Sequence, residues 1–192
     1  MNRIEAKLGD TLNRFNFIFK NEEIYTECIK YNEGFSILGE NFGPFEKGKK
    51  YKLKLFLARP FIENNILKVA PSEKCDNTDV QRYAIAERDD QRLIQQDNKY
   101  FLNKIKEFQY FMEKKVKDRV KPMIDLDRYN SYLSDIINSR LLKLLRLTKS
   151  KLSLDDEKRL TNSEKALFDI IYDYINTWRT FYLEKKQKET MR

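Results

Sequence analysis

The sequence predicts an α+β protein, in which a small N-terminal β-rich domain is followed by a larger all-α helical bundle. The five glycines all lie before residue 49, and three of the four prolines lie before residue 72. Glycine favours tight turns and destabilises helices, so its absence from the rest of the chain favours helical structure there. Apolar residues also alternate singly in the first part but recur every three or four residues in the second. We therefore expect a β-rich domain over residues 1–75, with residues 1–14 as a candidate tail, and a helical bundle over residues 76–192.

Short segments of the first part have the alternation or the bounding glycines that are typical of β-strands. The clearest of them alternates apolar residues with lysines, which places the two residue types on opposite faces. A turn over residues 43–48, rich in glycine and proline, joins two of these segments. The expected strands are residues 15–19, 23–31, 34–39, 51–58 and 66–70.

The second part has the apolar stripes of amphipathic helices. Ser153 with Asp156 marks the start of a short helix, and Thr161 with Glu164 forms a capping box that opens the last helix. Four or five helices of this kind make a bundle. The expected helices are residues 77–96, 100–120, 125–148, a short one after Ser153 and a long one after Thr161.

The residue types that are missing exclude most catalytic chemistry. The chain has no histidine, which excludes a Ser-His-Asp triad, a Cys-His dyad and a histidine-ligated zinc site. Cys28 and Cys75 are too few for a four-cysteine zinc site, although a single disulfide between them stays open. No apolar run approaches the roughly 18 residues that cross a membrane. We expect a soluble intracellular protein with no catalytic residue, metal or cofactor.

Two patterns resemble nucleotide or metal sites but have simpler explanations. Residues 43–49 match the phosphate-loop pattern G-x-x-x-x-G-K, but Lys50 occupies the position of the Mg²⁺-binding Ser or Thr. Pro44 also removes a backbone N–H that such a loop offers to phosphate, so we interpret the segment as a turn. Paired aspartates at helix starts or on helix faces are explained by capping and solvation rather than by catalysis. These pairs are Asp89 with Asp90, Asp125 with Asp127, Asp155 with Asp156, and Asp169 with Asp173.

The densest basic cluster lies in the expected strand 51–58 and the turn before it. Its members are Lys47, Lys49, Lys50, Lys52 and Lys54. They are candidate nucleic-acid contacts, with Tyr51 and Phe56 available for stacking on bases. The alternative, which we favour, is the outer face of an edge strand, where lysines discourage aggregation.

The last helix carries an unusual number of aromatic residues. Tyr174, Trp178 and Phe181 share one stripe, while Tyr172 and Tyr182 lie off it. Aromatic residues on a second face indicate a protein interface, because interfaces are enriched in Tyr, Trp and Phe. A wide core face with tyrosines at its margin explains the pattern equally well. Tyr174, Trp178 and Phe181 are therefore expected in the bundle core or at a subunit interface.

Two parts of the sequence together resemble a known family. The first is residues 34–48, which contain Gly-Pro-Phe from Gly43 and a further glycine at Gly48, followed by the leucine-rich residues 53–58. The second is residues 132–144, with Arg-Leu-Leu-Lys-Leu from Arg140, followed by residues 160–168 and the aromatic helix. In this order they resemble subunits of the GINS complex, a DNA replication factor, of the Psf-two and Psf-three type, whose small β domain precedes the helical domain. The resemblance spans about residues 15–183.

The resemblance implies a non-catalytic scaffold. GINS joins the MCM helicase to a RecJ-like, DHH-fold partner in the active replicative helicase, and archaeal versions combine two subunit types in a two-plus-two heterotetramer. The implied partners are a second GINS subunit, MCM and the RecJ-like protein, with primase or polymerase as further candidates. DNA contact is implied to be weak or indirect. The lysine-rich and tyrosine-rich composition favours an archaeal, nucleoid-associated protein of the cytoplasm, and a eukaryotic one would be nuclear.

Overall fold

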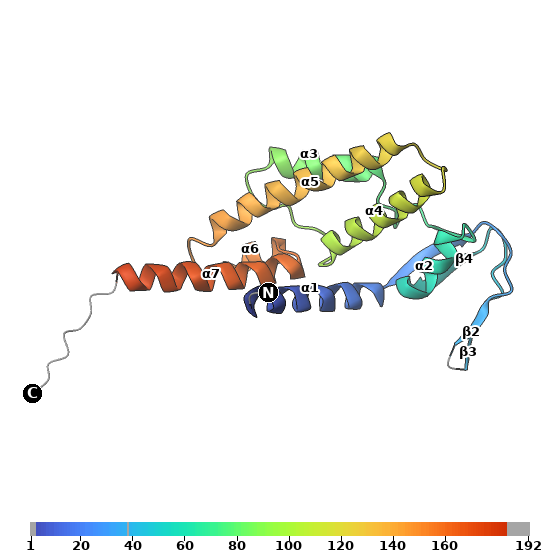
Figure 1. Cartoon of the computed structure of the whole chain (residues 1–192), viewed down its shortest axis with the longest axis horizontal. Helices are drawn as coiled ribbons and strands as arrows, with labels where there is room; N and C mark the ends of the chain where they lie inside the picture. The colour runs from blue at the N-terminus through green and yellow to red at the C-terminus, as the bar shows by residue number, and fades with distance from the viewer. Residues whose placement is uncertain (1–2, 38, 184–192) are drawn as a thin grey trace, which may run out of the picture.

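The computed structural model describes residues 3–37 and 39–183, and it confirms an α+β fold whose strands precede the main helical part (Figure 1). The first part comprises α1 (Arg3–Lys20), β1 (Glu23–Cys28), β2 (Phe35–Ile37), β3 (Glu40–Phe42), β4 (Lys50–Lys54), α2 (Leu55–Glu63) and β5 (Leu67–Val69). The second comprises α3 (Asn77–Asp89), α4 (Phe101–Lys117), α5 (Met123–Leu147), α6 (Leu154–Arg159) and α7 (Asn162–Leu183). Among these described residues, no helix has the length and hydropathy needed to cross a lipid bilayer.

Strands β4, β1 and β5 form an antiparallel sheet in that order, so β1 is central. Along β1, Ile24, Thr26 and Cys28 are buried while Glu23 and Tyr25 are exposed. This period of two is typical of a sheet with one covered face and one solvated face. Strands β2 and β3 form a separate hairpin. The strands expected within residues 23–31, 34–39 and 66–70 are therefore confirmed.

The strand expected over residues 15–19 is wrong, because these residues end helix α1. Phe19 is buried in the core beneath the sheet, whereas Phe17 is 71 % exposed, so the phenylalanines do not form one face. Residues 3–14, expected as a tail, are part of the same helix. The start of α1 lies beside the start of α7, and α1 also contacts α4 and α2, so it joins the first part of the chain to the helical part (Figure 1).

The strand expected over residues 51–58 is correct only as far as Lys54, where α2 begins. Leu55, Ala58 and Ile62 lie three and four residues apart and are buried together in the core beneath the sheet. The spacing of apolar residues in this segment is compatible with one face of a helix and also with a short strand. The helix forms because it buries these three side chains together.

All five expected helices are present, although α3 ends at Asp89 rather than near residue 96. Helix α6 begins after Ser153, whose hydroxyl accepts a hydrogen bond from the Asp156 amide. At the start of α7, the Thr161 amide donates to the Glu164 carboxylate and the Glu164 amide donates to the Thr161 hydroxyl. The capping box expected from the sequence is therefore confirmed.

Helix α4 connects the core under the sheet with the core of the bundle. Phe111 lies in the cluster that contains Ile24 of β1, and the next residue, Met112, lies in the cluster that contains Val80 of α3 and Tyr129 of α5. The two parts of the chain therefore share α4 as a common wall, and the boundary expected near residue 75 falls between β5 and α3.

Cys28 and Cys75 are both buried and unpaired, so the disulfide left open by the sequence does not join them. Burial raises the pKa of the Cys75 thiol to about 11. The Tyr129 hydroxyl, which donates to the Ile105 carbonyl, lies 4.0 Å from the Cys75 Sγ.

We expect Cys75 to be inert toward thiol reagents near pH 8 in the folded protein, because the thiolate is the reactive form. The pKa of the Cys75 thiol is 9.0 in the unfolded chain and about 11 in the folded protein. The free energy of unfolding is therefore expected to fall as pH rises through that interval, because the unfolded chain releases the proton first. Timed iodoacetamide labelling and mass spectrometry of the Cys75 peptide check this, with the urea-unfolded chain as control. Equal labelling rates in both states would contradict it.

Candidate protein-interaction surface

The C-terminal half of α7 exposes a row of aromatic side chains. Tyr174 is 54 % exposed, Trp178 64 % and Phe181 75 %, so their solvent exposure increases toward the end of the helix. A role in the core of this chain is therefore wrong for all three. Tyr182 and Leu183 are also exposed, and the rings of Trp178 and Tyr182 lie 5.1 Å apart. We call these five residues the aromatic end of α7.

The exposure follows from the way α7 leaves the body of the protein. In Figure 1, α7 begins beside α1 and α6 and then runs out beyond the other helices. Its first half carries Glu164 and Phe168, which are both buried, and Tyr172 stacks on Phe168 with ring centroids 5.6 Å apart. In the outer half, Arg179 donates a hydrogen bond to the Lys149 carbonyl. One helix thus has a buried half and an unburied half.

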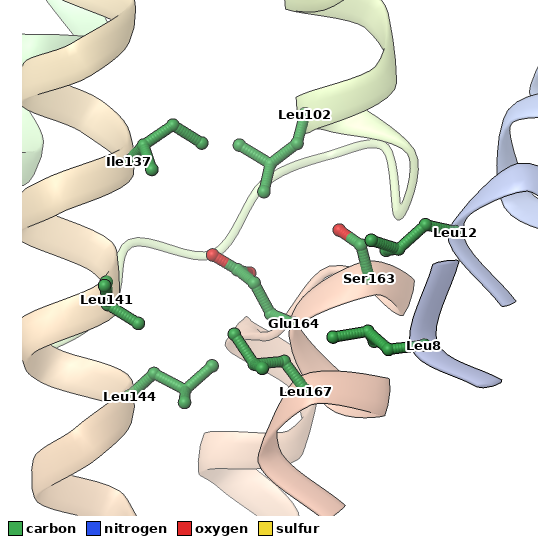
Figure 2. Close-up of a pocket in the computed structure, with 9 residues that line it drawn as sticks. All are labelled: Leu8, Leu12, Leu102, Ile137, Leu141, Leu144, Ser163, Glu164 and Leu167. Carbon is green, nitrogen blue, oxygen red and sulfur yellow. The ribbon is translucent and has the colours of Figure 1, made fainter. Parts of the chain in front are cut away.

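An apolar groove of about 210 Å³ opens beside the first half of α7. Figure 2 shows side chains from four helices pointing into it. Leucines and an isoleucine make most of its wall, with Ser163 and Glu164 as its polar part. We call it the leucine groove. Its apolar members are Leu8 and Leu12 of α1, Leu102 of α4, Ile137, Leu141 and Leu144 of α5, and Leu167 of α7.

Helix α5 extends this apolar surface beyond the groove. Ile137 is 40 % exposed, Leu141 38 %, Leu142 59 % and Leu145 40 %. Exposed apolar groups scattered singly need no explanation, but a helix that exposes four within nine residues is typical of a binding surface. The leucine groove can accept one large apolar side chain from a protein that covers this face.

A buried ionic network holds the start of α7 against α3 and α5. The Arg140 guanidinium is 1 % exposed and donates to both carboxylate oxygens of Glu164, at 2.6 and 2.8 Å. It also donates to the Glu87 carboxylate at 2.8 Å and to the carbonyls of Ile94 and Arg159, both at 3.0 Å. The planar guanidinium satisfies five acceptors from four segments, a geometry that lysine cannot reproduce.

Lys143 completes the network. Its ammonium donates to the carboxylate and the carbonyl of Glu87 and to the Arg92 carbonyl. Burial alone would lower the pKa of Arg140, but the hydrogen bond and charge of Glu164 and the charge of Glu87 outweigh it, so the pKa is raised. The network of Arg140, Lys143, Glu87 and Glu164 therefore joins α3, α5 and α7 through buried ion pairs.

The candidate nucleic-acid contacts lie on and before an edge strand, β4, as the favoured interpretation expects. Lys50 stands opposite Glu27 and Lys54 opposite Glu23 on β1. The Lys52 ammonium lies 2.5 Å from the Glu23 carboxylate. The Lys49 ammonium lies 2.8 Å from the Glu46 carboxylate, so two of the five lysines have an ion-pair partner within the described part of the chain. The side chains that remain exposed there are Lys47, Lys49, Lys50, Lys52 and Lys54.

The other sequence patterns acquire structural roles. Residues 43–49 lead into strand β4 rather than a helix, so the segment lacks the helix N-terminus that a phosphate loop requires. Asp155 and Asp156 accept hydrogen bonds from Arg92, at 2.5 and 3.1 Å. Within residues 3–37 and 39–183, no cluster of three or more cysteine, aspartate or glutamate side chains has metal-binding geometry.

The sequence analysis missed the leucine groove. Leu8 and Leu12, which form one of its walls, lie in the segment that was expected to be a tail. Their spacing of four residues is a helical signal, but two positions alone do not identify a helix.

No protein-family model matches the chain, and no curated protein matches it.

Proposed function

We propose that this chain is a non-catalytic scaffold subunit of a GINS complex, which links the MCM replicative helicase to a RecJ-like partner in DNA replication. The proposal combines the sequence resemblance with the exposed apolar surface of the helical part. The observation that carries it is the aromatic end of α7, where Trp178 and Phe181 extend into solvent from a helix that is buried only in its first half.

Exposed aromatic residues of this kind are the usual anchors of protein interfaces. Burying one large aromatic side chain contributes about 1.5–3 kcal/mol. A second subunit that covers the aromatic end of α7 and the adjoining face of α5 would bury several such groups at once. Obligate interfaces of this character commonly bury about 2,000 Å² or more.

The two sequence segments of the helical part that carry the resemblance meet in the buried ionic network. Arg140 belongs to residues 132–144 and Glu164 to residues 160–168, and their side chains form a bidentate pair. This contact supports the view that residues 132–144 and 160–168 pack together, and that the aromatic end of α7 extends from this packed region.

Co-expression with a second GINS-type subunit, followed by native mass measurement, tests the assembly. We expect a two-plus-two complex, because the exposed apolar surface of α7 and α5 favours association with another polypeptide. A pull-down with MCM and with the RecJ-like protein tests the scaffold role. A chain that stays monomeric beside the second subunit and captures neither protein would contradict the proposal.

The rival function is a nucleic-acid-binding module that uses the strand lysines Lys47–Lys54. It predicts that the chain alone binds single-stranded DNA with an affinity that falls steeply with salt. A fluorescence titration at two salt concentrations separates the two functions. Tight, salt-sensitive binding that is lost in Lys50→Glu would favour the rival.

A further inference from the structure

The turn between α4 and α5 is the most basic segment of the described chain outside β4. Residues 114–121 read Lys-Lys-Val-Lys-Asp-Arg-Val-Lys, with five basic residues and one acidic residue. Lysines near a helix C-terminus interact favourably with the helix dipole, which accounts for those before residue 118. It does not account for Arg119 and Lys121, which follow the helix. We call residues 114–121 the basic turn.

Only two of the five cations have a carboxylate partner. Lys114 pairs with Asp118 at 3.4 Å, and Lys121 pairs with Asp125 at 3.1 Å. Within the described part of the chain, no carboxylate forms an ion pair with the other three, which are Lys115, Lys117 and Arg119. Partial burial and the neighbouring charge of Lys121 both lower the pKa of the Lys115 ammonium. A bound anion would relieve this repulsion.

Arg119 occupies a backbone position where glycine is the usual residue. Its φ is +59°, in the left-handed region. Its amide donates to the Val116 carbonyl at 3.0 Å, and the Val120 amide donates to the Lys115 carbonyl at 2.8 Å. This is a Schellman closure of α4, in which a glycine after the helix avoids the steric cost of a side chain. The Arg119 side chain itself is exposed just beyond the end of α4.

A cleft of about 400 Å³ adjoins the basic turn, between β5 and the C-terminal half of α4. Its floor includes the buried side chains of Leu67, Phe111 and Met112. Its rim includes Lys115, Val120 and Lys121, and Val120 is 61 % exposed. An apolar floor beside unpaired cations complements a ligand that combines an apolar group with carboxylates.

We propose that the basic turn and this cleft bind an acidic segment of a partner protein. One apolar side chain of that segment enters the cleft, and its carboxylates pair with Lys115 and Arg119. Nucleic acid fits less well, because a phosphate backbone would leave the apolar floor and Val120 without a partner. The proposal goes beyond the scaffold role and does not depend on the aromatic end of α7.

Fluorescence anisotropy with the full chain and labelled synthetic peptides tests the proposal. The probe is an eight-residue peptide of glutamate and aspartate with one central phenylalanine, a size chosen to span about 25 Å when extended. Two control peptides replace the phenylalanine by serine or the acidic residues by lysine. A single-stranded DNA octamer is the fourth probe. We expect saturable binding of the first peptide, at least about threefold weaker binding of the serine peptide, and none of the lysine peptide.

Variants locate the site. Arg119→Gly is expected to weaken binding of the acidic peptide about threefold without lowering Tm, and Lys115→Glu to weaken it about tenfold. Lys151→Glu, the same charge change on an exposed loop lysine, is the matched control and is expected to have no effect. A probe that does not bind, DNA that binds more tightly than the peptide, or an equal loss in Lys151→Glu would each overturn the proposal. None of these results would alter the assembly measurement that tests the scaffold role.

Discussion

Replacing Arg140 with alanine is expected to lower the free energy of unfolding by about 3–5 kcal/mol, the cost of breaking a buried ion pair by removing one partner. The substitution leaves the Glu164 carboxylate buried with hydrogen bonds only from Thr161, and it leaves Glu87 with Lys143 alone. The Arg159 carbonyl also loses the Arg140 donor, and the Ile94 carbonyl keeps a hydrogen bond from the Gln96 side chain at 3.4 Å. Urea unfolding followed by circular dichroism measures the effect.

Arg92→Ala is the matched control for Arg140→Ala. Arg92 also binds two carboxylates, but its side chain is 55 % exposed. Exposed pairs contribute about 0–1 kcal/mol, so the control is expected to unfold within about 1 kcal/mol of the wild type. Arg140→Lys is expected to lie between the two, because it keeps the charge but loses the bidentate fork. A loss below about 1 kcal/mol for Arg140→Ala would show that the network does not determine the packing of α3, α5 and α7.

Replacing Trp178 with serine is expected to weaken binding of the second subunit about 30-fold or more, as truncation of an interface hot spot costs about 2 kcal/mol or more. The free energy of unfolding of the isolated chain is expected to stay within about 0.5 kcal/mol, because the side chain is exposed there. Light scattering with the second subunit measures assembly, and urea unfolding of the chain alone measures stability.

Tyr31→Ser provides a control for the Trp178 experiment. Tyr31 is 59 % exposed, close to the 64 % of Trp178, but it lies in the loop between β1 and β2. We expect this variant to assemble as the wild type does. Unchanged assembly of both Trp178→Ser and Phe181→Ser would remove the aromatic end of α7 from the interface.

Helices α4, α5 and α7 could be predicted because each has a long apolar stripe, and α6 and α7 also have a clear capping signal at their starts. The Thr161 capping box and Ser153 are local features, and local hydrogen bonds are enough to define them. The secondary structure of the first part was harder to predict. In residues 15–19 and 55–58, apolar and polar residues alternate over too few positions to distinguish a strand from a helix. In α1, contact with α7 and α4 outweighs the weak β pattern.

The aromatic stripe of α7 was visible in the sequence, but its exposure was not, because periodicity identifies a face without identifying what covers it. The buried role of Arg140 had a signal that the sequence analysis did not use. Arg140 follows Ile136 by four residues and precedes Lys143 by three, so both cations occupy positions of the buried α5 stripe. The carboxylate partners of Arg140 lie 53 and 24 residues away in the sequence, and that of Lys143 lies 56 residues away, so no local rule connects them.

The projection of α7 beyond the body also affects how such a chain can diverge in sequence. Tyr174, Trp178 and Phe181 lie outside all three cores, whereas Phe168 on the same helix lies within one. Substitutions in the outer half of α7 can therefore alter binding to another protein, while the free energy of unfolding of the chain stays nearly constant. After gene duplication, substitutions at a few positions of α7 would be enough to give the two copies different binding preferences. Every intermediate variant would still fold.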